Sequence, residues 1–105
     1  MKEEKQTALE AAFTQALFKN MEQAESFGIT DKRLRANCEK YGAVSAVKEV
    51  LRKKGKSDTF SQLAERHKAN LTVEAVVTDS RFGALFEDEE VNACFMSLCE
   101  AGFFH

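Results

Sequence analysis

The stretch LTVEAVVT, residues 71–78, is compatible with two local structures, and the fold class of the chain depends on which of them forms. Its apolar positions alternate with more polar ones, as in a half-buried β-strand, at Leu71, Val73, Ala75 and Val77. Thr72, however, is a good N-cap for a short helix. No second strand candidate exists to pair with this stretch. We therefore predict a short helix here.

Helical periodicity, interrupted by glycines, covers the chain before this stretch. Between Lys5 and Phe27, apolar residues recur three and four positions apart, at Leu9, Phe13, Leu17, Met21, Ala24 and Phe27. Phe27-Gly28-Ile29 is typical of a Schellman helix end, and Thr30 is the expected N-cap of a second helix over 31–40. A third helix is marked by valines, runs into Arg52-Lys53-Lys54 and stops at Gly55.

Two further helices are expected in the second half of the chain. Thr59 and Gln62 have capping-box spacing, which predicts a helix that ends at Asn70 and carries inward Phe60, Leu63, Ala64 and His67. The last helix begins with Asp88-Glu89-Glu90, closes at Gly102-Phe103 and directs to the core Val91, Cys94, Phe95, Leu98 and Ala101. The predicted fold is an all-α, compact bundle of about six short helices, a single domain over residues 1–105.

Composition indicates a globular cytoplasmic protein. Of the 105 residues, 44% are hydrophobic and 30% charged, and no apolar run is long enough to cross a membrane. The charged N-terminus lacks the apolar region of a signal peptide. Cys38, Cys94 and Cys99 match neither a disulfide framework nor a metal or redox pair, so we expect reduced core residues. Phe18 lies off the first apolar stripe and Phe103-Phe104 follow the last helix, so these rings either form an exposed patch or fold back.

One segment resembles a helical tail found in uncharacterised bacterial and mobile-element proteins. The resemblance covers residues 71–103, about a third of the chain, and consists of hydrophobic patterning. It is carried by Leu71-Thr72-Val73-Glu74-Ala75-Val76, Phe82, Leu85-Phe86 and Glu89-Glu90. It implies helical structure and no particular activity.

No catalytic, metal-binding or cofactor-binding residues are predicted. His67 could meet Cys38 or Cys94 in space, but a lone Cys and His without a local signature favours a boundary histidine. Cys94 and Cys99 are five positions apart, about 140° around a helix, and cannot face one zinc ion. The acidic run 87–90 is explained by the positive end of a helix dipole, and no nucleotide-binding glycine loop occurs.

The charges are distributed unevenly along the chain. Residues 32–56 carry +7 and the remainder −9, within a net charge of −2. Two basic helices joined by Tyr41-Gly42 have the outline of a helix-turn-helix, although the outward row would contain Glu49 among Ser45, Lys48 and Arg52. The candidate contact residues of this basic face are Arg33, Arg35, Lys48, Arg52, Lys53, Lys54 and Lys56.

These observations favour a non-enzymatic protein-interaction or regulatory module, in which electrostatics would orient a partner protein. A phage-type inhibitor carried by a mobile element is one form that such a module could take. The alternative is a weak, phosphate-directed nucleic-acid-binding protein that uses the same basic helix pair, residues 32–56. Self-association is left open, and no membrane partner is expected.

Overall fold

The computed structural model describes the backbone of residues 2–102 and the side chains of residues 7–102. The predictions for Phe103 and Phe104 lie outside this range. Within it there is no strand, which confirms the all-α prediction. The elements are α1 (Lys2–Glu25), α2 (Lys32–Tyr41), α3 (Ala43–Lys54), α4 (Phe60–Glu65), the 3₁₀ helix η1 (Ala69–Leu71), α5 (Val73–Val77), the 3₁₀ helix η2 (Ser80–Leu85) and α6 (Asp88–Glu100).

The ambiguous stretch forms α5, as predicted. The Thr72 hydroxyl oxygen accepts a hydrogen bond from the Ala75 N–H at 3.1 Å and donates one to the Ala69 carbonyl at 2.6 Å. Thr72 therefore both ends η1 and caps α5. The helix α5 is buried on most of its circumference, so its apolar residues do not form a single face. For this reason the pattern of its sequence resembles that of a strand.

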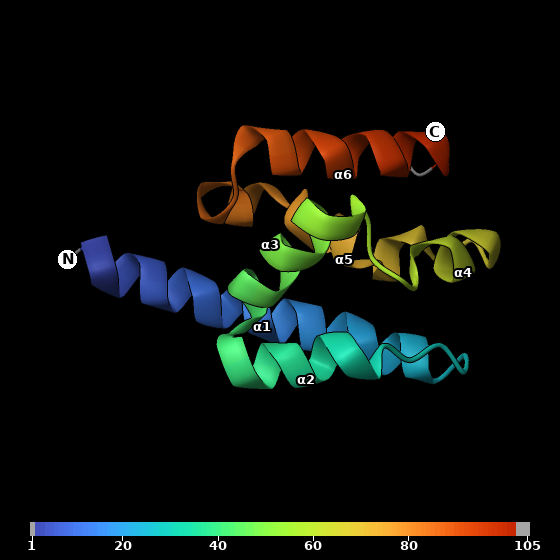
Figure 1. Ribbon diagram of the computed structural model, residues 1–105, viewed down its shortest axis with the longest axis horizontal. Helices are drawn as coiled ribbons and strands as arrows, with labels where there is room; N and C mark the ends of the chain where they lie inside the picture. Colours follow the sequence, from blue (N-terminus) through green and yellow to red (C-terminus); the bar gives the residue numbers. More distant parts are fainter. Residues whose placement is uncertain (1, 103–105) are drawn as a thin grey trace.

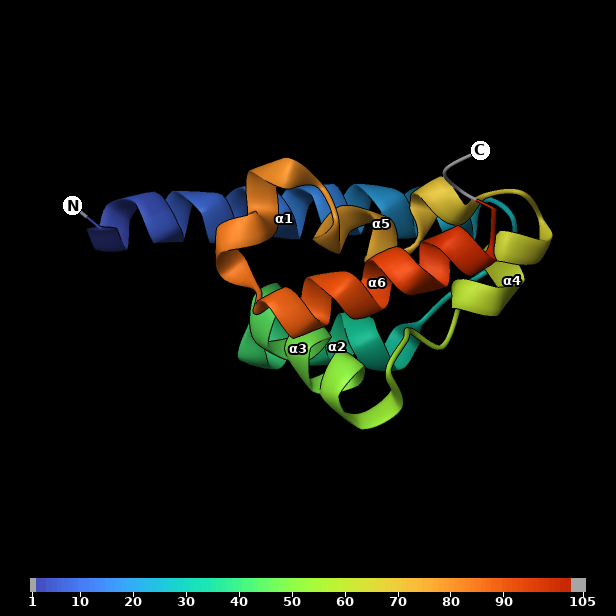
Figure 2. The same cartoon turned by 90° about the horizontal axis from the view of Figure 1, so that it is seen from above.

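The helices are arranged in layers, with α1 and α2 at one side of the molecule and α6 at the other (Figure 1), and Figure 2 shows the same arrangement from above. Between them α3 crosses the bundle and α5 lies under α6. The centre of the core contains fully buried side chains from several of these layers: Phe13, Leu17, Val47, Val77, Phe82 and Cys94. Among the helices of residues 2–102, none combines the length and the apolar character that a membrane span requires.

The predicted end of the first helix is confirmed. The Ile29 N–H donates to the Ala24 carbonyl at 3.1 Å and the Gly28 N–H to the Glu25 carbonyl at 2.9 Å, the pair of bonds that defines a Schellman motif. Gly28 has a φ of +79°, which glycine adopts without a Cβ clash. Ile29 then packs against Ala24, and the chain turns back toward α2.

One predicted helix cap is wrong, and the other has the predicted position without a cap hydrogen bond. Asp31, not Thr30, caps α2, because its carboxylate accepts from the Leu34 N–H at 3.0 Å and the helix starts one residue later than expected. Thr59 precedes α4, but its side chain makes no cap hydrogen bond.

The fourth helix is shorter than predicted and does not carry His67 inward. It ends at Glu65, and Asn70 belongs to η1 instead. The Lys68 N–H donates to the Leu63 carbonyl at 2.8 Å and the His67 N–H to the Ala64 carbonyl at 3.0 Å, which is a second Schellman motif. His67 takes its left-handed position, with a φ of +60°, and is exposed.

The last helix buries a narrower stripe than the sequence predicts. Cys94 and Leu98 are fully buried, as expected. Phe95 is 40% exposed and Ala101 is also exposed, so both were wrongly assigned to the core. Cys99 is a free thiol as predicted, but it is exposed rather than buried.

Candidate functional site

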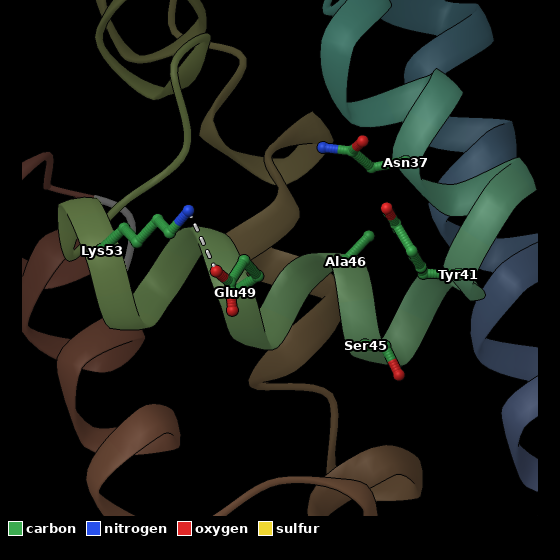
Figure 3. Close-up of a pocket in the computed structure, with 6 residues that line it drawn as sticks. All are labelled: Asn37, Tyr41, Ser45, Ala46, Glu49 and Lys53. Atoms are coloured by element: carbon green, nitrogen blue, oxygen red, sulfur yellow. Dashed lines mark ion pairs between the residues drawn. The ribbon is translucent and has the colours of Figure 1, made fainter.

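A hollow lies between the two basic helices. Gly42 alone joins α2 to α3, with a φ of +91°, and the helices diverge from this point (Figure 3). The space between them has a volume of about 530 Å³. It is lined by Asn37 and Tyr41 of α2 and by Ser45, Ala46, Glu49 and Lys53 of α3. We call this hollow, with its smaller continuation, the α2–α3 groove.

The continuation is a second hollow of about 110 Å³ that shares Asn37, Glu49 and Lys53 with the first. It extends toward the start of α2 and the loop after α3, where it is lined by Asp31, Arg33, Lys54 and Asp58 among others. The groove is thus lined mainly by polar and charged side chains. It offers amide, hydroxyl, carboxylate and ammonium groups along one surface.

Glu49 lies in the middle of the groove and binds two of the predicted contact residues. The Arg52 Nη2 donates to Oε2 at 2.7 Å and to Oε1 at 2.8 Å, and the Lys53 Nζ lies 3.1 Å from Oε1. The hydrogen bonds from Arg52 and then Lys53 lower the pKa of the Glu49 carboxyl group. Glu49 is therefore ionised at neutral pH and compensates part of the positive charge around it.

Three other predicted contact residues form ion pairs with acids from outside the basic block. Lys54 Nζ lies 2.8 Å from Asp58, Arg35 Nη2 3.1 Å from Glu25, and Lys48 Nζ 3.9 Å from Glu90. When the charges of these three acids are added to the +7 of residues 32–56, the local charge falls to +4. The basic block is therefore less positive toward a partner than its sequence indicates.

The seven predicted residues do not share one face. Arg33, Lys53 and Lys54 line the groove, and Arg52 is bound beside them to Glu49. The other three contact different elements: Arg35 stacks over Phe18 of α1 at 5.4 Å, Lys48 reaches Glu90 of α6, and Lys56 lies over Phe60 of α4 at 5.7 Å. Phe18 itself is half-buried and also packs against the main core.

The helix pair differs from a helix-turn-helix in two respects. The turn is a single residue, whereas that motif uses about three or four. In the outward row of α3, Lys48 and Arg52 are both engaged with carboxylates. A phosphate would have to compete with these acids for the cations.

Sequence reasoning did not identify Asn37 and Tyr41 as site residues. Tyr41 follows Leu34 by seven positions, and this spacing favours the buried face of a helix. As the last residue of α2 it is instead 61% exposed, at the end of the groove where α2 and α3 meet. Lys40 lies over its ring at 5.1 Å from the centroid.

The residues considered for chemistry are separated in the structure. Burial raises the pKa of the Cys38 thiol to about 11 and of the Cys94 thiol to about 12, so both are protonated at neutral pH. His67 is exposed, whereas these two thiols are buried. Within the described part of the chain, no three His, Cys, Asp or Glu side chains converge in a way that could hold a metal ion.

We compared the chain with family models, curated proteins and solved structures, and none of them matches it.

Proposed function

We propose that this chain is a small, non-enzymatic protein-interaction module that binds a partner protein in the α2–α3 groove. The observation that carries the proposal is Tyr41, which is 61% exposed at the end of the groove where α2 and α3 meet, among side chains with hydrogen-bonding groups. Exposed tyrosines are frequent anchors of protein interfaces, because the ring contributes apolar area and the hydroxyl a hydrogen bond.

The charges around the groove support a protein rather than a polyphosphate as the partner. Glu49 binds Arg52 and Lys53, and Asp58 binds Lys54, so the surface presents alternating charges with a small positive excess. Such a surface suits a partner that has both hydrogen-bonding groups and some negative charge. Binding to nucleic acid gains most of its free energy from unpaired cations that displace counterions.

Two parts of the proposal concern its setting. A phage-type inhibitor would act by occupying a functional surface of its target protein, which requires no catalytic residue of its own. A cytoplasmic compartment would keep the thiols of Cys38, Cys94 and Cys99 reduced, in keeping with the free cysteines of the structure.

Photo-cross-linking tests the groove. Tyr41 is replaced by a photoreactive phenylalanine derivative, and the variant is irradiated in a lysate of the source cells. Gln62, exposed on α4, is the matched control position. We expect one specific adduct from position 41 and none from position 62. A variant with Asn37→Ala and Ser45→Ala should then reduce the affinity for that partner about tenfold.

Charge reversal separates the two kinds of partner. The variant with Arg52→Glu, Lys53→Glu and Lys54→Glu is compared with one that reverses the exposed Lys19 and Arg66. Anisotropy titrations with mixed-sequence DNA and RNA, at low and physiological salt, should show no micromolar binding by the unaltered protein. Salt-sensitive binding that only the first variant loses would replace the proposal by the nucleic-acid alternative.

A further inference from the structure

The helix α6 forms an outer layer of the molecule and presents one side to solvent. It runs along the top of the bundle in Figure 1 and in front of the other helices in Figure 2. At about 100° per residue, its exposed side chains fall on one continuous side of the helix. We call these residues the α6 outer stripe: Asp88, Glu89, Asn92, Phe95, Met96, Cys99 and Glu100.

The centre of the stripe is apolar without being part of the core. Met96 is 65% exposed and Phe95 40%, while Cys94 and Leu98 fill the core from the opposite side of the helix. The exposed thiol of Cys99 extends the same surface by one turn. Apolar side chains that gather on an exposed helix face are a candidate contact surface. Met96 is the best anchor because its flexible side chain adapts to a partner.

The ends of the stripe are acidic, and α6 contains no Lys or Arg. The helix dipole favours carboxylates in the first turn, which explains Asp88 and Glu89. The same dipole disfavours a carboxylate in the last turn, where Glu100 lies. Glu100 is exposed, so packing does not explain its presence at this position. Negative charge at both ends of an exposed apolar surface is complementary to a basic partner.

We propose that the α6 outer stripe binds a basic amphipathic helix of a partner protein. An apolar side chain of that helix packs on Met96, and its Lys or Arg residues meet Glu89 and Glu100. These two positions are about 16 Å apart along the helix axis, which sets a spacing of about three turns between the cations of the partner. The surface is separate from the α2–α3 groove, and this proposal does not depend on the function proposed for it.

The test uses the full chain and a synthetic peptide as the probe. The peptide is a helix of about five turns with one leucine stripe flanked by lysines. A second peptide has the same composition in scrambled order. Backbone amide shifts in an NMR titration should change in α6 with the first peptide and remain unchanged with the scrambled one. Changes confined to other elements, or equal affinity for both peptides, would overturn the proposal.

Variants then separate the stripe from general attraction between opposite charges. Met96→Lys, and separately Glu89→Lys with Glu100→Lys, should each weaken binding about tenfold or more. The matched control reverses Glu39 and Glu65, which are exposed on α2 and α4. This control should have little effect on binding. An equal loss of affinity in the control would show that the binding is non-specific electrostatic attraction.

Sedimentation of the free protein tests whether a second copy of the chain binds to the α6 outer stripe. The expected result is a monomer over the concentration range of the titration. Concentration-dependent association that Met96→Lys abolishes would overturn the proposal, because the basic helices of another copy would then cover the stripe.

Discussion

The joint between α1 and η2 is built from aromatic rings, whereas the joint between α5 and the loop before α4 is built from a buried carboxylate and a serine. Phe13 contacts Phe82 with ring centroids 5.4 Å apart and Phe86 with centroids 5.2 Å apart, both edge to face. Glu74 is fully buried and accepts hydrogen bonds from the Ser57 N–H at 2.6 Å and from its hydroxyl at 2.8 Å.

The two joints differ in what they contribute to the fold. The aromatic joint stabilises the fold by burying apolar surface. It does not require one orientation of the rings, because apolar contacts are not directional. The polar joint gains little net free energy, since a buried carboxylate loses its hydration, but it accepts only a donor pair placed as in Ser57. It therefore fixes the course of the loop that follows Arg52, Lys53 and Lys54, and with it the end of the groove.

Removing the aromatic joint should have the largest effect on stability. Phe13→Ala leaves a cavity between α1 and η2 and should lower the free energy of unfolding by about 3–5 kcal/mol. Urea denaturation measures this change. Phe27→Ala is the matched control, because Phe27 is 40% exposed, and it should lose less than about 1 kcal/mol. Equal losses in both variants would show that the ring cluster has no special role.

Removing the polar joint should have an intermediate effect. Glu74→Ala leaves both Ser57 donors buried without an acceptor and should lower the free energy of unfolding by about 1–3 kcal/mol. Ser57→Ala keeps the backbone donor and should cost about 1 kcal/mol. Denaturation of the two single variants and the double variant gives their coupling. Additive losses would contradict a direct interaction between these side chains.

The sequence predicted one side of the aromatic joint, the buried position of Phe13, but neither its partner rings nor the polar joint. Phe13 lies on a stripe with regular spacing, and glycines mark several helix ends, so periodicity was sufficient for the long helices. Glu74 stands at a polar position of LTVEAVVT, where a half-buried element would expose it. Its burial depends on Ser57, seventeen positions earlier, and no local pattern records such a pair.

The candidate site was predicted in part for the same reason. Charge counting located the basic block, and Arg33, Lys53 and Lys54 do line one groove. Counting along the chain could not show that Glu25, Asp58 and Glu90 approach these helices from other segments. The groove itself arises where α2 and α3 diverge after Gly42, a geometric property of two helices that no single residue encodes.

Titrating the buried carboxylate should give the smallest effect, because it changes only a proton. Burial raises the pKa of Glu74 in the folded protein, and the Ser57 hydrogen bonds and Lys56 oppose this rise without cancelling it. The folded state then binds a proton more tightly than the unfolded state. The contribution of Glu74 to stability is therefore full below its ordinary pKa and is lost as the pH rises through its raised value.

The measurement compares pH profiles of stability for the unaltered protein and for Glu74→Gln, which cannot titrate at this position. The stability of the unaltered protein relative to that of Glu74→Gln should fall as the pH rises. The hydrogen bonds with Arg81 lower the pKa of Asp79, so Asp79 changes the stability in the opposite direction. Because Asp79 is present in both proteins, its contribution cancels in the difference. A difference that does not change with pH would mean that the pKa of Glu74 in the folded protein equals its ordinary value, because the hydrogen bonds from Ser57 fully offset the effect of burial. The joint would then be a stronger anchor of the groove loop than its two hydrogen bonds indicate.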